Sequence, residues 1–218
     1  MDTRIIITFL MLLVAGRTTA QDHGKTKNPP VMVETVVGSR GVQSQIIMDK
    51  SFQSLPKFGF FNVSSIVGEW GEREVKDGMV QSYLTYNIYK GLKVNAGFLY
   101  ASPVGILPSG GLMYTYGSQR FTAVVFQRID LADKPNTESI VLLEYKPRIS
   151  EKLDFYSRVQ GQYIHHISTD THTKSAIFLR AGLKYREFTF GAAFNADYYG
   201  PDKTIMNNIG GFLGVALF

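Results

Sequence analysis

Strict alternation of apolar and polar side chains is the sequence feature that most limits how this chain folds. In residues 153–163 the odd positions are mainly apolar or glycine, and the even positions are mainly polar, with Asp154 and Arg158 among them. The stretches 177–186 and 188–198 repeat this pattern. A period of two over roughly ten residues indicates β-strands whose two faces meet different surroundings. Such strands exceed the soluble average of about 5–6 residues and match the 9–11 residues of a tilted membrane strand.

The same period continues through most of the chain and predicts twelve strands. The first strand has the weakest pattern, and ten strands is the alternative if the N-terminal pair lies on the periplasmic side. An all-β soluble sandwich is the competing fold, because its strands also alternate. The predicted strands are 31–38, 42–53, 58–70, 78–89, 92–101, 110–117, 120–130, 137–147, 151–165, 174–186, 187–198 and 206–218.

The connections between these strands are expected to alternate in length. Lys90-Gly91 and Arg186-Glu187 are short, whereas 71–77 and 167–173 are longer and polar. Outer-membrane barrels have short periplasmic turns and longer extracellular loops. The pattern therefore predicts that the short turns face the periplasm.

The N-terminal residues have the organisation of a secretory signal peptide. Arg4 supplies a basic start, residues 5–14 an apolar core, and 18–20 a small-residue cleavage site before Gln21. The apolar core is shorter than the roughly 20 residues of a spanning helix, so we expect it to be removed on export. The predicted organisation is a signal peptide at 1–20, a flexible leader at 21–30 and a barrel at 31–218.

Composition narrows the class further. The chain has no cysteine, so no disulfide framework stabilises an exported product, and stability must come from a large core or from a bilayer. Loss of residues 1–20 removes Arg4, Arg17 and Asp2, which takes the net charge from +5 to about +4. That mild excess, spread along an exported chain, argues against a nucleic-acid partner. A mature chain that crosses a membrane without long apolar runs must do so as a closed barrel.

The last strand ends on Phe218 with no polar tail behind it. This resembles the closing strand of bacterial outer-membrane β-barrels, and the chain as a whole resembles the small barrels of this class that are common in Bacteroidota. The resemblance implies an antiparallel up-and-down transmembrane β-barrel in the outer membrane, in contact with outer-membrane lipid. It also implies that the barrel-assembly machinery reads Phe218 as an assembly signal.

One feature of the last strand departs from the expected pattern. Leu213, Val215 and Leu217 occupy the parity that should face a polar lumen. We expect either that the leader at 21–30 packs against this wall as a plug, or that a bulge near Gly210-Gly211 shifts the parity.

The polar faces of the strands are predicted to line the lumen. A barrel of ten or twelve strands lies between the side-chain-filled interior of about eight strands and the water channel of about sixteen. The charges support two interpretations, an ion-paired filling or a narrow pore with a modest preference for anions. The predicted lumen-facing residues are Arg128, Glu144, Lys146, Asp154, Arg158, Arg180, Lys184, Arg186 and Asp197.

Aromatic residues gather at the predicted strand ends, where membrane barrels carry interfacial girdles. Those near the longer loops are Trp70, Tyr100, Tyr163, Tyr198 and Tyr199, and those near the short turns are Phe52, Phe58, Tyr116, Phe121, Tyr145, Tyr185, Phe188 and Phe218.

A histidine-rich segment is the strongest candidate for other chemistry. His165, His166, Asp170 and His172 are metal-ligand types, but their spacing fits no established site and a loop holds ligands poorly. Ser168 beside them offers a nucleophile without the motif of a lipid-modifying barrel enzyme. We therefore predict a polar surface loop, with no metal, no cofactor and no catalytic residue.

These features predict an integral outer-membrane β-barrel that is porin-like or structural, with a narrow polar lumen that passes small solutes or ions. The alternative is a binding or complex-scaffold barrel, whose protein partner docks on the extracellular loops. A lipid-modifying outer-membrane enzyme is the third hypothesis.

Overall fold

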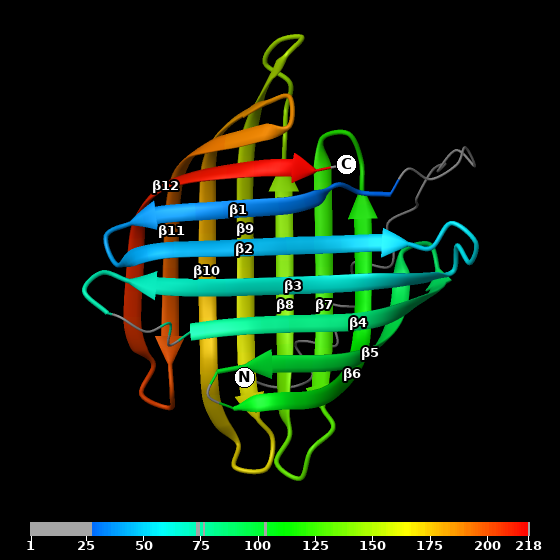
Figure 1. Ribbon diagram of the computed structural model, residues 1–218, viewed down its shortest axis with the longest axis vertical. Coiled ribbons are helices and arrows are strands. Elements are labelled where there is room, and N and C mark those ends of the chain that lie inside the picture. The colour runs from blue at the N-terminus through cyan, green and yellow to red at the C-terminus, as the bar shows by residue number, and fades with distance from the viewer. Residues whose placement is uncertain (1–27, 73–74, 76, 103, 218) are drawn as a thin grey trace.

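The computed structural model describes residues 28–72, 75, 77–102 and 104–217. It shows a closed barrel of twelve antiparallel strands in which sequence neighbours pair and β1 closes on β12 (Figure 1). This confirms the predicted fold class. The described part of the chain contains no helix that could span a membrane. The strands are β1 Val31–Gly38, β2 Gly41–Ser51, β3 Phe58–Glu69, β4 Asp77–Tyr89, β5 Leu92–Ala101, β6 Gly105–Gly117, β7 Phe121–Asp130, β8 Asn136–Tyr145, β9 Leu153–His166, β10 Thr171–Tyr185, β11 Phe188–Tyr199 and β12 Thr204–Leu217.

Most strand boundaries lie within three residues of the prediction, and β6 is the main exception. It begins at Gly105, five residues earlier than expected, despite Pro108. The Pro108 carbonyl accepts a hydrogen bond from the Leu131 amide beyond the end of β7. The missing N–H of Pro108 faces the same side, because both backbone groups of a residue in an antiparallel strand point one way. Proline therefore removes no bond from the β5–β6 ladder.

The predicted contrast between short turns and long loops is wrong. The β5–β6 and β9–β10 connections shrink to 102–104 and 167–170, whereas β2–β3 and β8–β9 span 52–57 and 146–152. The cause is that β6, β10 and β12 start earlier than the sequence pattern suggested, whereas β2 and β8 end earlier and β9 starts later. Loop length alone consequently gives no orientation in a membrane.

The two ends of the barrel can still be distinguished by the connections they carry. We call the end with the β2–β3, β4–β5, β6–β7, β8–β9 and β10–β11 connections the turn rim, and the other end the opposite rim. In Figure 1 the turn rim follows the right side of the front strands and the top of the back strands. The Asn28 side chain accepts a hydrogen bond from the Ser51 amide (2.8 Å) and donates one to the Ser51 carbonyl (2.9 Å). The described end of the leader is thus tied to the turn rim.

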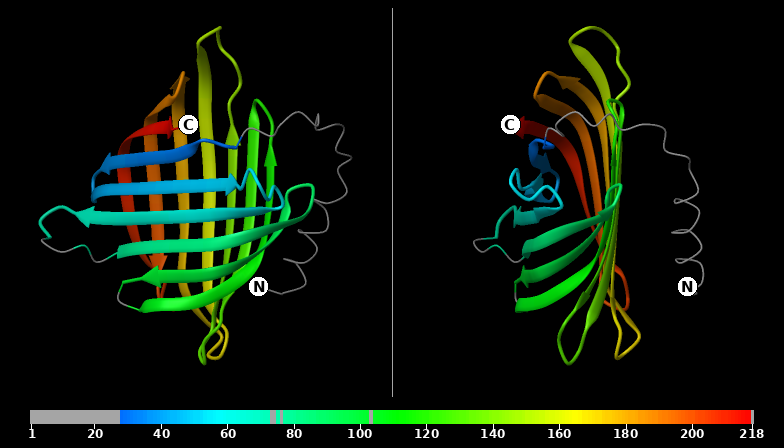
Figure 2. Two further views of the ribbon diagram at one scale, coloured as in Figure 1. Left: turned by 45° about the vertical axis from the view of Figure 1, so that its right-hand side comes forward. Right: turned by 90° about the vertical axis from the view of Figure 1, so that its right-hand side faces the viewer.

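The barrel has two walls that face each other across a narrow interior. Strands β1 to β5 run across the front of β7 to β11 in Figure 1, and Figure 2 shows the two walls from the side. Two apolar clusters fill part of the space between them. They are Phe61, Val63, Tyr83, Met113 and Phe126 in one, and Val36, Tyr156, Ala193 and Phe212 in the other. Because β1 and β9 are four places apart in the ring, the second cluster spans the interior.

The predicted parity of the last strand is wrong. Leu213 is 58% exposed and faces outward, whereas Phe212 is 5% exposed and faces the interior. The pairing of β12 with β1 and with β11 runs without a register shift, so no bulge is present near Gly210-Gly211. The inward positions of β12 include Gly210 and Gly214, where a Cβ would meet atoms of the adjacent strands β1 and β11. Whether residues 21–27 enter the lumen lies outside the described residues.

Candidate functional site

The barrel interior gathers most of the charged side chains that the sequence analysis singled out. Arg128, Glu144, Arg158, Arg180 and Asp197 are all buried, with no more than 8% of any of them exposed. They come from five consecutive strands, β7 to β11, and each sits at a position that alternates with outward apolar residues. The period of two therefore turns these charges inward.

Three more of the predicted residues lie near the turn rim on the inward parity. Lys146 donates to Glu144 over 2.8 Å, and Lys184 lies directly opposite Asp154 in the β9–β10 register. Arg186 does not share their position. It lies exposed in the β10–β11 turn with a φ of 55°, because β10 ends one residue earlier than predicted.

A central network joins β1 and β2 to β9, β10 and β11. Glu34 accepts hydrogen bonds from Arg158 (2.5 Å) and from Arg180 (2.9 Å). Arg180 also donates to Asn195 (2.6 Å), and Asn195 donates to Gln43 (2.5 Å). One carboxylate thus holds two guanidinium groups across the lumen, and the amides complete the chain of contacts.

A second network links β4 to β7, β8 and β9. Arg128 forms ion pairs with Asp130 and with Glu138. Glu138 also accepts hydrogen bonds from Gln81 (2.8 Å) and from Gln162. Because β4 and β8 are four places apart in the ring, the Gln81–Glu138 bond crosses the interior.

A third network closes the lumen at the opposite rim. We call Asp77, Lys174, Asp197 and Tyr199 the mouth cluster. Lys174 lies 3.0 Å from Asp77 and 3.5 Å from Asp197, and the Tyr199 hydroxyl donates to Asp77 over 2.6 Å. Since β4 and β10 are six places apart in a ring of twelve, the Lys174–Asp77 pair joins strands on opposing sides of the barrel. Tyr199, predicted as a girdle residue, instead faces the lumen.

Arg40, in the β1–β2 turn, extends this closure outward. It contacts Glu69 at 2.5 Å and Asp197 at 3.3 Å. Burial lowers the pKa of the Arg40 guanidinium, but its contacts with Glu69 and Tyr199 outweigh burial and raise that pKa above its usual value. Arg40 is therefore cationic and bridges the turn to the mouth of the barrel.

Several of these residues were not predicted from the sequence. Glu34 was missed because β1 has the weakest pattern, and Asp77, Glu138 and Lys174 because they lie near strand ends, where parity is hard to assign. Counting positions outward from the buried Arg158 and Arg180 would have placed Lys174 on the inward face. A single sequence contains no pattern that identifies the ion-pair partner of each charged residue.

Together the first two networks close the lumen in its middle. Gln81 and Asn195 are 0% exposed and Arg128 is 2% exposed, although all three line the interior. A continuous water channel would leave its lining accessible. Among the described residues, however, buried polar atoms of Gln81, Asn95, Arg158 and Gln160 make no hydrogen bond. The lumen is therefore tightly packed, but some of its buried polar atoms lack a hydrogen-bond partner in the described chain.

The histidines of the histidine-rich segment contact different partners. His165 contacts Asp170 at 3.0 Å, His166 contacts Thr169 at 2.9 Å, and His172 contacts the Gly200 carbonyl at 2.6 Å. Each histidine thus has its own local partner. Within the part of the chain that the structure describes, no group of three or more metal-ligand side chains converges. Ser168 is exposed, and neither neighbouring histidine is bonded to it.

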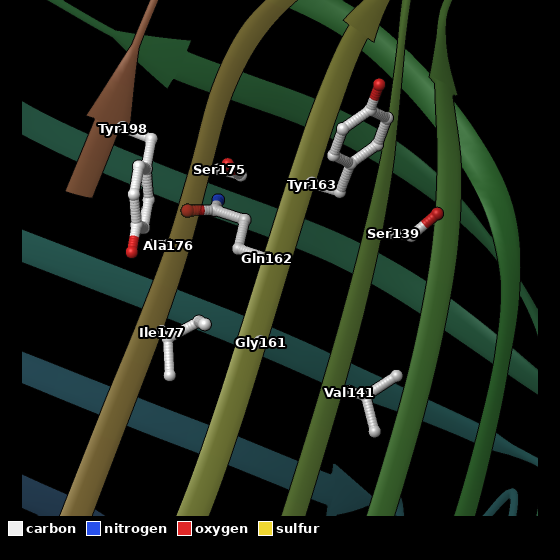
Figure 3. Close-up of a pocket in the computed structure, with 9 residues that line it drawn as sticks. All are labelled: Ser139, Val141, Gly161, Gln162, Tyr163, Ser175, Ala176, Ile177 and Tyr198. Atoms are coloured by element: carbon white, nitrogen blue, oxygen red, sulfur yellow. The ribbon is translucent and has the colours of Figure 1, made fainter. Parts of the chain in front are cut away.

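A groove of 340 Å³ lies on the outward face of β8 to β11, with Tyr163 and Tyr198 on either side of it (Figure 3). Its lining contains no acidic, basic or imidazole side chain, so it offers no base for a serine nucleophile. The lining residues are Ser139, Val141, Gly161, Gln162, Tyr163, Ser175, Ala176, Ile177 and Tyr198.

Comparison with known proteins gives similarity in structure only. No protein-family model and no curated protein matches the chain. Among solved structures, the NanC porin is similar over 86% of this chain and 99% of its own, with 13% identity and a TM-score of 0.49. The KdgM porin in complex with disordered oligogalacturonate covers 86% of this chain and 100% of its own, with 8% identity and a TM-score of 0.48. LpxR from Salmonella typhimurium covers 86% and 99%, with 7% identity and a TM-score of 0.36. At these values, function has to be inferred from the chain's own residues.

Proposed function

We propose that the chain is an integral outer-membrane β-barrel of porin-like architecture, whose narrow polar lumen is held shut at rest by ion pairs between opposing strands. This proposal rests on the distribution of side chains, which is the reverse of the distribution in a water-soluble protein. Leu84, Val159 and Ile209 each expose more than half of their surface on the outside, while Arg128 and Glu138 are buried inside. A charge facing lipid near the midplane costs about 2–4 kcal/mol, so this arrangement suits a bilayer and not water.

The lining favours a gated path over a dry filling. Gln81, Asn95 and Gln160 keep buried side-chain oxygens without a hydrogen bond in the described chain, and each such atom costs about 1–3 kcal/mol. A water molecule or a small ion that moves through the lumen can supply those contacts. The Lys174–Asp77 pair of the mouth cluster then acts as the barrier at the opposite rim.

Single-channel recording in planar bilayers tests this gate. We expect the wild-type barrel to show rare, brief openings. The triple variant Asp77→Asn, Lys174→Met, Asp197→Asn should open more often than wild type, because the ion pairs at the mouth are lost while the two networks in the middle of the lumen remain. Asp133→Asn with Lys134→Met, in an exposed loop at the same rim, is the matched control and should behave as wild type.

The passage of solutes is refuted if folded wild type and the triple variant are both silent at every voltage. Folding is read from gel migration in detergent with and without heating, which changes when a barrel unfolds. In that outcome the chain keeps a structural role in the membrane.

The orientation and the route to the membrane are part of the same proposal. We infer that residues 1–20 direct export, that the turn rim faces the periplasm, that the assembly machinery reads Phe218, and that the source is a bacterium of the Bacteroidota type. The support is the resemblance of the signal-peptide pattern and of the terminal aromatic residue. Phe218 itself lies outside the described residues.

Cysteine labelling on intact cells tests the orientation, since the chain has no native cysteine. An Asp202→Cys variant at the opposite rim should react with a membrane-impermeant maleimide. A Gln119→Cys variant at the turn rim should react only after the outer membrane is permeabilised. The reverse pattern would place the turn rim outside.

A binding or scaffold barrel is the second candidate, and one observation favours it. Five apolar side chains stand exposed in connections of the opposite rim. They are Trp70, Val75, Val104, Leu131 and Ile167. If a protein partner docks there, serine substitutions at these positions should abolish its co-purification with the barrel and leave heat-dependent gel migration unchanged.

A further inference from the structure

Every connection of the turn rim carries at least one exposed basic side chain. We call these six residues the cationic ring. They are Lys57, Lys90, Arg120, Arg148, Lys152 and Arg186. The exposed acidic residues in the same connections are Glu151 and Glu187, so positive charge exceeds negative charge by three to one at this rim.

The described residues of the opposite rim show no excess of exposed basic side chains. Its exposed charged residues, among those the structure describes, are Glu72, Asp133, Lys134, Asp170, Asp202 and Lys203. Four of these six are acidic. Among the residues that the structure describes, the excess of exposed basic side chains is therefore found at the turn rim.

The cationic ring lies just beyond a band of outward aromatic side chains. Lys90 lies over the ring of Tyr89 at 5.2 Å, and Arg186 over the ring of Tyr185 at 5.5 Å. Arg120 directly precedes Phe121, whose ring packs against Tyr116 at 6.2 Å. Aromatic side chains of membrane barrels sit at the boundary between hydrocarbon and headgroups. The cations one step farther out consequently lie at the depth of the lipid phosphates, with their apolar stems along the aromatic band.

The arrangement around the perimeter indicates what such a ring binds. The charges do not form one patch, because each belongs to a different connection, apart from Arg148 and Lys152. A single folded ligand would need neighbouring charges on one side. Many small anions in a plane around the barrel would instead meet one cation each.

We propose that the cationic ring binds the phosphates of anionic glycerophospholipid headgroups in the leaflet that surrounds the turn rim. This rests on the proposed function as a membrane-integrated barrel. Arginine holds phosphate with paired N–H donors and lysine with a point charge, so both residue types suit this ligand. The described part of the opposite rim has no comparable set of exposed basic side chains, so we expect the selectivity at the turn rim alone.

Electron paramagnetic resonance of spin-labelled lipids tests the inference. The full-length chain is folded into phosphatidylcholine vesicles that contain a trace of spin-labelled phosphatidylglycerol or phosphatidylcholine. We expect the barrel to immobilise phosphatidylglycerol in preference to phosphatidylcholine, by roughly two- to five-fold at low ionic strength, and the preference to shrink as salt screens the charges.

Variants at the two rims test whether the preference for phosphatidylglycerol comes from the cationic ring or from the net charge of the chain. Replacing all six ring residues by glutamine (K57Q, K90Q, R120Q, R148Q, K152Q and R186Q) should abolish the preference. The matched control at the opposite rim, K134Q with K203Q, should keep it. If the six-residue variant fails to fold, K90Q with R186Q, which removes the same number of charges as the control, should still reduce the preference more than the control does.

Three results would overturn the inference. They are an equal affinity of the wild type for both lipids, an unchanged preference in the six-residue variant, and a preference for spin-labelled lipid A over phosphatidylglycerol. In each of these cases heat-dependent gel migration still shows a folded, inserted barrel, and the proposed function stands. A chain that does not insert into vesicles refutes the proposed function itself.

Discussion

Arg128 shows how single residues stabilise the interior of this barrel. Its guanidinium lies between the carboxylates of Asp130 and Glu138, and all three side chains are at most 1% exposed. Burial of one isolated charge costs several kcal/mol, and only good geometry with opposite charges offsets that cost. The triad is therefore much more sensitive to the loss of one member than an exposed ion pair.

Replacement of Arg128 by methionine should destabilise the barrel by about 3–5 kcal/mol, because two buried carboxylates lose their partner. The measurement is the urea midpoint of unfolding in detergent, followed by heat-dependent gel migration. Arg148→Met, in an exposed turn, is the matched control and should change stability by less than about 0.5 kcal/mol. Equal midpoints for the two variants would show that the triad contributes nothing to stability.

For single residues, the sequence predicts whether a side chain faces the lumen better than it predicts which residue that side chain contacts. The period of two places Arg158 and Arg180 in the lumen without any structure. It cannot show that both meet Glu34, because that residue lies on a strand more than one hundred positions earlier in the sequence. Arg186 shows where the period of two fails, since one residue of strand length decides between a lumen position and an exposed turn.

Among the elements, β12 depends on glycine for its fit against β1. Gly210 lies on the inward face opposite Gly38, and a Cβ there would collide with the backbone of Val37 and Gly38. Backbone atoms cannot move aside as a flexible side chain can. The glycine therefore allows the first and last strands to pair at this level.

A Gly210→Val substitution should weaken the β1–β12 pairing and cost about 1–3 kcal/mol or more, the usual range for overpacking. Gly161→Val is the control, because a Cβ on that outward-facing glycine meets nothing within 4 Å. Unfolding in urea should separate the two variants clearly. If both unfold at the wild-type midpoint, the pairing has room that the structure does not show.

The elements were predictable in number and less so in detail. Alternation fixed twelve strands because each had to present different faces to two surroundings. It failed in β12, where glycine at the inward positions carries no polarity signal and outward Leu213 was assigned to the lumen. It also failed to place the start of β6 at Gly105. A proline usually interrupts a strand, and Pro108 is tolerated here only because it faces the chain beyond the end of β7, which the sequence of β6 alone does not show.

For the whole molecule, closure of the ring is the property on which the lumen and both rims depend. Val31 of β1 lies opposite Leu217 of β12, and this pair completes the sheet at the turn rim. Directly opposed residues in an antiparallel pair have Cα atoms about 4.5–5.5 Å apart, a distance that a disulfide can bridge.

A Val31→Cys, Leu217→Cys double variant should therefore form an internal disulfide after folding, and not in the urea-unfolded chain. The product is detected as a faster band on a non-reducing gel. Val31→Cys with Ile209→Cys is the control, because residue 209 lies beside Ser39, just beyond the far end of β1, and should not cross-link. Cross-linking of both pairs would contradict the pairing in Figure 1.

The β1–β12 pairing also affects how the protein reaches its folded state. Pairings between neighbouring strands can form early, but the ring closes only when the first strand meets the last, after almost the whole chain has been synthesised. Contacts of such sequence separation make folding slow. Until then two strand edges and an apolar outer face are open to other chains, which is the condition in which β proteins aggregate. The edge of β1 therefore stays open to aggregation until β12 is available to pair with it.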